Sequence, residues 1–262
     1  MSQRMKLFAI LWLAGMTGVG SLLLIDIPGL VANLPLPPGT EIPPFTPLMR
    51  ILAVAQPAVI LSLAVFAGVA VAPKVGLSSP VGEAIARGGR WHVALKPQIV
   101  PGLLGGVAGG LAIVLITAVS KPFLPADVVA RVRELSQVLP FATRLLYGGV
   151  FEELLLRWGL MTLLVWAAWR ILHKGRDRPR PSFFVGAILM SALVFAAGHL
   201  PIALLLLPEP TPAYVTFVIA ANSIFGVIAG FLYWRKGLES AVIAHMVTHA
   251  VLLVAGYWGV YF

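Results

Sequence analysis

Long uncharged apolar runs dominate the chain from one end to the other. A helix needs about 20 mostly apolar residues to cross the hydrocarbon core of a bilayer, and six stretches without Asp, Glu, Lys or Arg reach that length. These stretches are residues 7–25, 51–73, 97–120, 181–208, 210–234 and 240–262. A seventh stretch, residues 142–172, is apolar except for Arg144, Glu152, Glu153, Arg157 and Arg170. The pattern predicts seven spans, of which the fourth carries charge within it.

The predicted fold is an all-α, polytopic transmembrane helix bundle of about seven spans, with six to eight as the range. No soluble domain fits between the spans, so residues 1–262 are expected to form a single integral membrane domain. Residues 7–25 lack a convincing signal-peptide cleavage site and are expected to stay as the first span. The proline-rich residues 27–47 are expected to be extended, whereas the periodicity of residues 126–139 predicts a helix along the membrane interface.

The composition agrees with a membrane protein and excludes several other classes. Only 11% of the residues are charged, 59% are apolar, and the mean hydropathy is +0.94. A soluble domain has about 25% charged residues, so we exclude an ordinary soluble enzyme, a disordered chain and a nucleic-acid-binding module. Because the chain has no Cys, it has neither a thiolate nucleophile nor a cysteine metal site. We expect a multi-pass protein of a lipid bilayer, which would be the cell membrane in a prokaryotic host.

The net charge of +9 is informative about orientation, because Lys and Arg concentrate in the cytoplasmic loops of membrane proteins. A cytoplasmic N-terminus puts 13 basic residues in inner segments and five in outer segments, with Arg157 left inside the membrane. We therefore predict that the N-terminus is cytoplasmic. The basic residues 174–180 fit an inner loop, and this topological role is favoured over specific lipid binding.

The fourth span contains two adjacent glutamates, which are costly in a bilayer and therefore candidates for function. Glu153 and Arg157 are four residues apart, so they share a helix face and can form an ion pair. Glu152 is expected to point about 100° away from Glu153 on an α-helix, without a partner on its own helix. The pair is as compatible with helix packing as with catalysis, but an unpaired carboxylate has no packing value.

Three histidines and an asparagine add polar groups to the later spans. His199 follows Phe195 by four residues, and His245 and His249 share a helix face at the spacing seen in metal-binding helices. Each imidazole is also compatible with a hydrogen bond between packed helices. Asn222 is equally compatible with a helix–helix hydrogen bond and with a role in a site.

Together these groups are suited to hydrolysis by an activated water. A carboxylate or imidazole can act as the general base, and imidazole or amide donors can stabilise an oxyanion. A divalent metal such as zinc is an open alternative, and its candidate ligands are Glu152, His199, His245 and His249. Counted along α-helices at about 1.5 Å per residue, Glu152 and His199 lie at similar depths, whereas His249 and His245 lie nearer the inner side. That difference requires a tilted helix, a shifted boundary or an off-centre cavity.

The order of these motifs on separate spans resembles the CAAX prenyl protease and bacteriocin-processing (CPBP, also called Abi) family of intramembrane proteases. The motifs are Glu152-Glu153-x-x-x-Arg157, Phe195-x-x-x-His199 and His245-x-x-x-His249, and the resemblance covers residues 145–255. The resemblance implies that Glu152, helped by His199, activates water, and that His245 and the residue at 249 bind the oxyanion. The family usually has Asn where this chain has His249, which keeps a donor there and adds a potential metal ligand.

We therefore expect an intramembrane endopeptidase with its catalytic core at about residues 142–260, in which Glu153, Arg157, Phe195 and Asn222 support the catalytic residues. Its expected partners are a peptide or membrane-protein substrate and the lipid bilayer, with no nucleic acid. The substrate, the oligomeric state and the metal dependence stay open. The main alternative is a cation or proton transporter that uses the same intramembrane Glu and His residues. A third hypothesis is a non-catalytic scaffold whose buried polar groups only fix helix packing.

Overall fold

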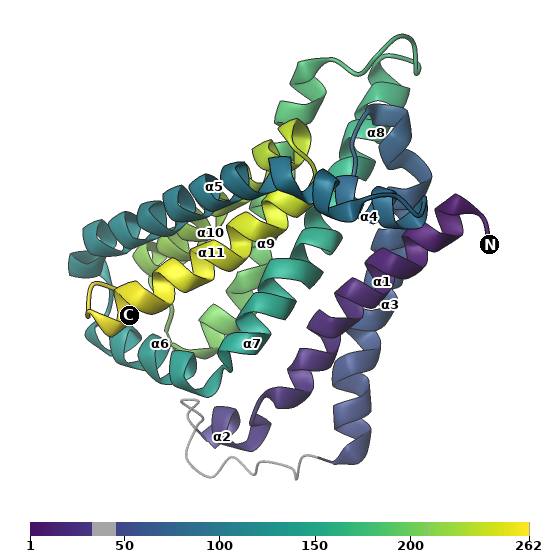
Figure 1. Cartoon of the computed structure of the whole chain (residues 1–262). Coiled ribbons are helices and arrows are strands. Elements are labelled where there is room, and N and C mark those ends of the chain that lie inside the picture. Colours follow the sequence, from purple (N-terminus) through teal and green to yellow (C-terminus); the bar gives the residue numbers. More distant parts are fainter. Residues whose placement is uncertain (33–45, 208, 262) are drawn as a thin grey trace.

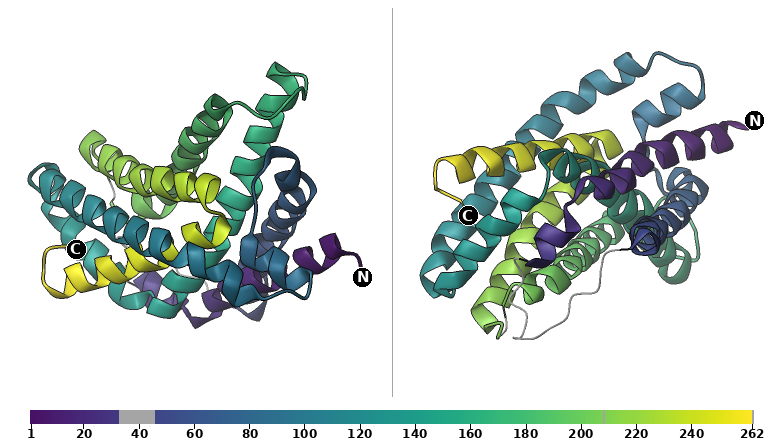
Figure 2. Two further views of the ribbon diagram at one scale, coloured as in Figure 1. Left: turned by 45° about the horizontal axis from the view of Figure 1, so that its top comes forward. Right: turned by 90° about the horizontal axis from the view of Figure 1, so that it is seen from below.

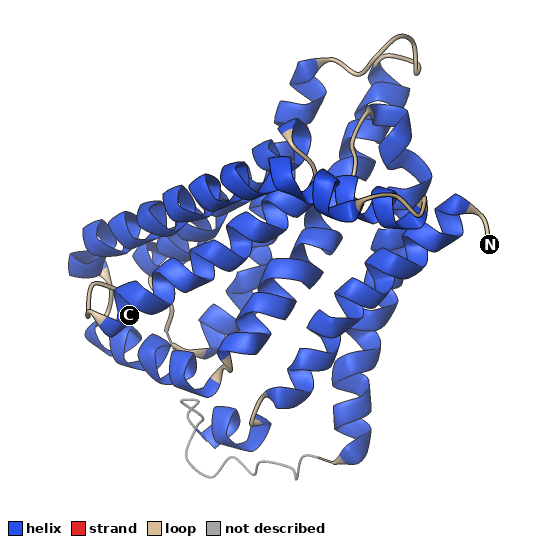
Figure 3. Ribbon diagram, viewed as in Figure 1, coloured by secondary structure: helices blue, strands red, loops and turns tan. Residues whose placement is uncertain are grey.

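The computed structural model of the chain describes residues 1–32, 46–207 and 209–261. Every regular element in these ranges is a helix, so the predicted all-α class is confirmed (Figure 3). The elements in chain order are α1 (Gln3–Ser21), η1 (Leu22–Leu24), α2 (Ile27–Ala32), α3 (Pro47–Val75), α4 (Pro80–Ala86), α5 (Trp91–Ser120), η2 (Lys121–Phe123), α6 (Ala126–Val138), α7 (Phe141–Thr143), η3 (Arg144–Glu152), η4 (Leu154–Met161), α8 (Thr162–Leu172), α9 (Pro181–Leu205), α10 (Pro212–Arg235) and α11 (Leu238–Tyr257).

Seven helices in the described part of the chain are long and apolar enough to cross a membrane, which confirms the predicted multi-pass architecture. They are Gln3–Leu24, Pro47–Val75, Trp91–Phe123, Phe141–Leu172, Pro181–Leu205, Pro212–Arg235 and Leu238–Tyr257. The third span begins at Trp91, earlier than predicted, because Lys96 falls within the helix and a long basic side chain near a helix end can reach the interface. The orientation of the bundle in the bilayer stays a prediction.

Two of the predicted connecting segments differ in outcome. Residues 126–138 form the predicted helix α6, although its position along the membrane interface stays a prediction. The expectation that residues 27–47 are extended is wrong for residues 27–32, which form α2. Pro28 is the second residue of α2, where the missing N–H of proline costs no helical hydrogen bond. The proline-rich residues 34–39 lie outside the described residues.

The fourth span is the central element of the bundle. It packs against α1 and α3 on one side and against α9, α10 and α11 on the other (Figures 1 and 2). Trp158 of this span is fully buried, and its indole N–H donates to the carbonyl oxygen of Val65 in α3 at 3.3 Å. Glu153 and Arg157 of this span are 0% exposed and thus surrounded by protein.

The fourth span is also wider than an α-helix over more than half of its length. The segments η3 and η4 are π-helical, separated only by Glu153, and α-helical geometry resumes at Thr162. A π-helix bonds residue i to residue i+5, and it is rare except as single turns at functional sites. Since such a helix rotates less per residue than an α-helix, neighbouring side chains on it point in more similar directions.

Helix α11, which carries two of the candidate histidines, is fixed along α5. Near its start the hydroxyl of Ser240 donates to the side-chain oxygen of Gln98 at 2.7 Å, and further along the hydroxyl of Thr248 donates to the carbonyl oxygen of Gly106 at 3.0 Å. The glycine-rich face of α5 allows this approach, since small residues let membrane helices pack closely. The position of α11 relative to the fourth span therefore depends on how closely it packs on α5.

This packing predicts a large effect of one added methyl group. A Cβ atom at Gly106 would lie 2.5 Å from Cβ of Val247 and 2.6 Å from the carbonyl oxygen of Ala244, whereas a Cβ atom at Gly186 in α9 would meet no atom within 4 Å. We expect Gly106→Ala to destabilise the protein by about 1–3 kcal/mol, as overpacking does. Gly186→Ala should be neutral or slightly stabilising. Unfolding in detergent measures both, and equal stability of the two variants would contradict this account of the α5–α11 contact.

Candidate active site

The fourth span approaches α11 closely because two consecutive glycines face that helix. A Cβ atom at Gly148 would lie 2.6 Å from Nε2 of His249, and one at Gly149 would lie 2.6 Å from Cγ of Met246. A side chain at either position would have to displace the His249 ring or the Met246 side chain. The glycine pair therefore allows the carboxylates that follow it to reach the imidazoles of α11.

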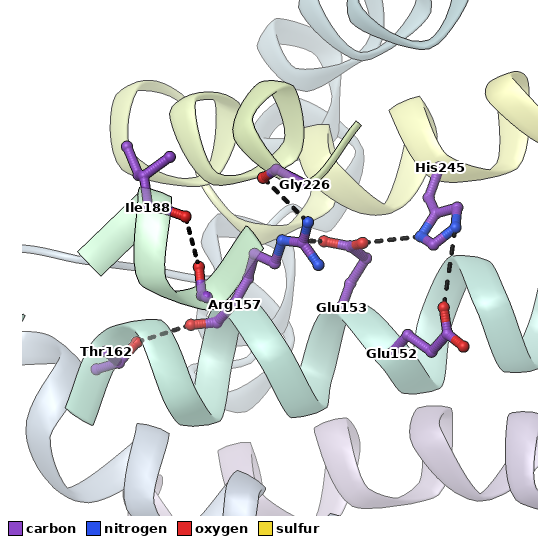
Figure 4. A network of polar contacts seen from close by, with 8 residues as sticks. Glu152, Glu153, Arg157, Thr162, Ile188, Gly226 and His245 are labelled. Carbon is purple, nitrogen blue, oxygen red and sulfur yellow. Dashed lines mark hydrogen bonds and ion pairs between the residues drawn. The ribbon is translucent and has the colours of Figure 1, made fainter. Parts of the chain in front are cut away.

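A buried chain of charged groups connects the fourth span to α11 (Figure 4). Nε of Arg157 lies 3.2 Å from Oε2 of Glu153, and Oε1 of Glu153 lies 2.8 Å from Nδ1 of His245. Arg157 and Glu153 are 0% exposed. The predicted ion pair is thus present, and it extends to His245 through the second oxygen of Glu153.

The guanidinium of Arg157 is held from α9 and α10 as well. Nη2 donates to the carbonyl oxygen of Gly226 at 3.1 Å, and Cζ lies 5.1 Å from the ring centroid of Phe195 and 6.0 Å from that of Phe225. Aromatic rings at these distances attract a cation, more strongly where water is excluded. Nη1 is buried and has no hydrogen-bond partner in the part of the chain that the structure describes. The aromatic faces therefore supply part of the stabilisation of this charge.

Glu152 has a different environment from its neighbour. Its side chain is 20% exposed, and its Oε2 lies 3.9 Å from Nε2 of His245, on the other side of the imidazole from Glu153 (Figure 4). The two adjacent carboxylates thus reach the two different nitrogens of one imidazole, an arrangement that an α-helical projection of the sequence did not indicate. The separation of 3.9 Å between these two atoms is too long for a direct hydrogen bond. Polar atoms at such a distance can be connected by a bridging water.

The depth expected for His245 also changes in the folded chain. Helix α11 runs obliquely to the fourth span (Figure 1), so His245 lies beside Glu152 and Glu153, although a count along upright helices separates them.

His199 joins the cluster through an aromatic ring. Its Nδ1 lies 2.9 Å from the carbonyl oxygen of Phe195, so that nitrogen carries the proton and Nε2 is left as an acceptor. The ring of Phe195 packs edge-on against His199, with 4.7 Å between centroids, and edge-on against His245, with 5.8 Å between centroids. Phe195 thus sets the position of His199 relative to His245.

The predictions for His249 and for Asn222 have different outcomes. The imidazole of His249 stacks on that of His245, with 4.9 Å between centroids and 13° between planes, so the predicted shared face is present. The side-chain amide of Asn222 donates to the carbonyl oxygen of Val218, one turn earlier in its own helix, at 2.8 Å. Asn222 thus makes neither of the predicted contacts through this N–H group, because the hydrogen bond stays within α10.

Phe225 is a member of the cluster that the sequence did not indicate. It is 2% exposed, and its ring centroid lies 4.3 Å from that of His245 and 6.2 Å from that of Phe195. One more phenylalanine in an apolar span carries no signal in a single sequence. The one sequence feature close to it is Asn222, three residues earlier on α10.

The candidate metal ligands do not form a metal site in this arrangement. Within the described ranges, no three His, Asp or Glu side chains are grouped so that they could hold a metal ion. Nδ1 of His245 and Nδ1 of His199 are already engaged, by Glu153 and by the carbonyl oxygen of Phe195. The donor set as it stands does not fit a three-ligand site.

Comparison with known proteins gives one match. Residues 134–251 match the family described as Rce1-like, type II CAAX prenyl endopeptidase. A search of curated proteins and a search of solved structures each gave no match. The match gives no support to the transporter alternative, and the family that it names is one of proteases, which are hydrolases. The matched segment carries all of the site residues and is similar to the Rce1-like family of CAAX prenyl endopeptidases, in line with the resemblance of its motifs.

Proposed function

We propose that this protein is an intramembrane endopeptidase in which the carboxylate of Glu152 activates a water molecule for attack on a peptide bond. The observation that carries the proposal is the contrast between the two adjacent glutamates. Both oxygens of Glu153 are engaged, one by Arg157 and one by His245, and its side chain is 0% exposed. Glu152 is partly exposed and lies 3.9 Å from the second nitrogen of the same imidazole. Glu152 is therefore the carboxylate that has room to bind water.

The proposed reaction proceeds in two steps. The Glu152 carboxylate removes one proton from the water while the water oxygen forms a bond to the carbonyl carbon of the peptide. The electron pair of the carbonyl double bond moves to oxygen, and the resulting oxyanion needs hydrogen-bond donors. When this intermediate collapses, the carbon–nitrogen bond breaks and the proton held by Glu152 passes to the leaving nitrogen. The products are a carboxylic acid and an amine.

His245 is the donor nearest to this reaction. Because Glu153 is paired with Arg157 and accepts, Nδ1 of His245 carries a proton and Nε2 faces Glu152. When Nε2 is protonated as well, this imidazole donates an N–H hydrogen bond to the oxyanion and keeps the proton, and the carboxylate of Glu153 stabilises the positive charge of the ring. The Glu153–His245 contact thus supports the oxyanion-binding role that the resemblance implies for His245.

His199 and His249 are proposed to assist from two sides of the site. Nε2 of His199 is an acceptor, which suits a group that helps Glu152 to orient the water. His249 stacks on His245 and is proposed to donate to the oxyanion in the place of the asparagine that is usual in the family. The substrate proposed first is a prenylated peptide of the CAAX type, because the family description names such substrates.

Replacement of the proposed base should abolish cleavage without unfolding the protein. We expect Glu152→Gln to lower kcat for a prenylated CAAX peptide in detergent or liposomes by at least about a hundredfold, the usual contribution of a general base. The melting temperature should stay within a few degrees of wild type, because Glu152 is not part of the buried ion pair. Glu83→Gln in α4 serves as a control for loss of one carboxylate. An active Glu152→Gln enzyme would overturn the assignment.

Loss of the neighbouring carboxylate should have a different effect. We expect Glu153→Gln to destabilise the protein by about 3–5 kcal/mol, because it leaves the buried charge of Arg157 uncompensated. The matched control is Glu83→Gln, which breaks another i,i+4 pair with arginine, Arg87, whose side chain is 63% exposed. That change should cost less than about 1 kcal/mol. Chemical unfolding of both variants measures the difference, and similar costs would mean that the Glu153–Arg157 pair does not support the fold.

Substitution of His249 distinguishes between the two roles that its imidazole allows, hydrogen-bond donor and metal ligand. If it donates a hydrogen bond, His249→Asn should keep kcat within about threefold of wild type, since asparagine offers a comparable donor, and His249→Phe should lose activity. Both variants should respond to a chelator as wild type does. If His249→Asn is inactive and added zinc restores cleavage by it, the residue acts as a metal ligand and the oxyanion assignment fails.

A further inference from the structure

Two buried hydroxyl groups meet beside the fourth span, about two turns beyond the proposed site: that of Thr162 in the span and that of Tyr233 in α10. Thr162 is 0% exposed and Tyr233 of α10 is 1% exposed. Their oxygens are 2.8 Å apart, and the hydroxyl of Thr162 also lies 3.1 Å from the carbonyl oxygen of Arg157 (Figure 4 shows the Thr162–Arg157 contact). Because a carbonyl only accepts, Thr162 donates to Arg157 and Tyr233 donates to Thr162.

These hydroxyl groups lie where the fourth span changes its helical form. The π-helical segment η4 ends at Met161, and α8 begins at Thr162. The backbone N–H of Thr162 also donates to the carbonyl oxygen of Arg157, five residues earlier. The same carbonyl therefore accepts from both the backbone and the side chain of Thr162, so the last wide turn is held by two hydrogen bonds. Tyr233 fixes the hydroxyl that makes the second of these.

Helix α10 consequently holds Arg157 at two points. Its Gly226 carbonyl accepts from the guanidinium of Arg157, and its Tyr233 acts through Thr162 on the backbone carbonyl of the same residue. Gly226 and Tyr233 are seven residues apart, or two helical turns, so they lie on one face of α10. Backbone and side chain of Arg157 are thus fixed by one rigid element.

The position of Arg157 is passed on to the proposed site by direct contacts. Its guanidinium pairs with Glu153, and Glu153 bonds to Nδ1 of His245. A shift of Arg157 along the span would move the Glu153 carboxylate and rotate the imidazole whose other nitrogen faces Glu152. Small displacements of this kind matter, because misplacement by about 1 Å can cost a hundredfold in rate.

From this chain of contacts we infer that Thr162 and Tyr233 are positioning residues for the proposed hydrolysis: they fix the π-to-α junction and thereby the alignment of Glu153 and His245. The inference rests on the function proposed above. Neither residue contacts the reacting groups, so their removal should affect the rate of the chemical step and leave the binding of substrate unchanged.

The test compares two buried tyrosines of the same helix. Tyr233→Phe removes the hydroxyl that bonds to Thr162, and Tyr214→Phe removes one that donates to the carbonyl oxygen of Ala203 at 3.1 Å in a residue 2% exposed. We expect Tyr233→Phe to lower kcat about tenfold with KM unchanged, while Tyr214→Phe keeps both constants. The two variants should have similar melting temperatures, since each loses one buried hydroxyl. Equal kcat values for the two would overturn the inference.

Thr162 offers a second and independent measurement. Thr162→Val keeps the shape and removes the hydroxyl, so it should lower kcat as Tyr233→Phe does, and Thr162→Ser should restore it. The double variant Thr162→Val with Tyr233→Phe should be no slower than Thr162→Val alone, since Tyr233 acts only through the hydroxyl of Thr162. If the losses in kcat of the two single variants add up in the double variant, Tyr233 does not act through Thr162.

The two proposals fail in distinguishable ways. If wild type cleaves and Glu152→Gln does not, but Tyr233→Phe matches Tyr214→Phe, the positioning role is wrong and the proposed function stands. If Glu152→Gln cleaves as wild type does, the proposed function is wrong and the positioning inference falls with it.

Discussion

The buried charge of Arg157 is the constraint on which the rest of the site depends. A charged side chain at the centre of a bilayer costs about 3 kcal/mol even on the mildest scales, and Arg157 has no exposed surface. Its charge is balanced by Glu153, by the Gly226 carbonyl and by the faces of Phe195 and Phe225. These contacts come from α9, α10 and the fourth span, so none of these helices can move relative to the others without exposing an uncompensated charge.

The ion pair also determines which of the two adjacent glutamates is available for chemistry. Glu153 is occupied by Arg157 and His245, and its negative charge is needed where it is. Glu152 precedes Glu153 on the same wide helix and approaches the other nitrogen of His245. Its side chain stays partly exposed. One carboxylate therefore stabilises the fold and orients the imidazole, while the other keeps an open side. Two adjacent glutamates in a membrane span are consistent with such a division of roles.

The sequence predicted the spans and most of the residues that lie together in the candidate site, and it did not predict where the fourth span departs from a regular α-helix. Apolar runs locate spans because every lipid-facing residue must be apolar, and charged residues such as Glu153 and Arg157 stand out against them. A π-helix has no such signature, so the wide form of the fourth span was not predictable, and neither was the contact of both Glu152 and Glu153 with His245. Phe225 is likewise indistinguishable from other apolar residues. Asn222 illustrates the converse, since a polar residue in a span can bond within its own helix.

The wide geometry of the fourth span is accompanied by specific contacts along its length. A π-helix longer than one turn is uncommon, so its persistence over η3 and η4 requires contacts that a narrower helix would lose. The close approach at Gly148 removes the steric barrier on the α11 side, the indole of Trp158 bonds to α3, and the hydroxyls of Thr162 and Tyr233 hold the junction with α8. These contacts lie on both sides of Glu152 and Glu153 in the chain, so the segment that carries the two carboxylates is fixed before and after them.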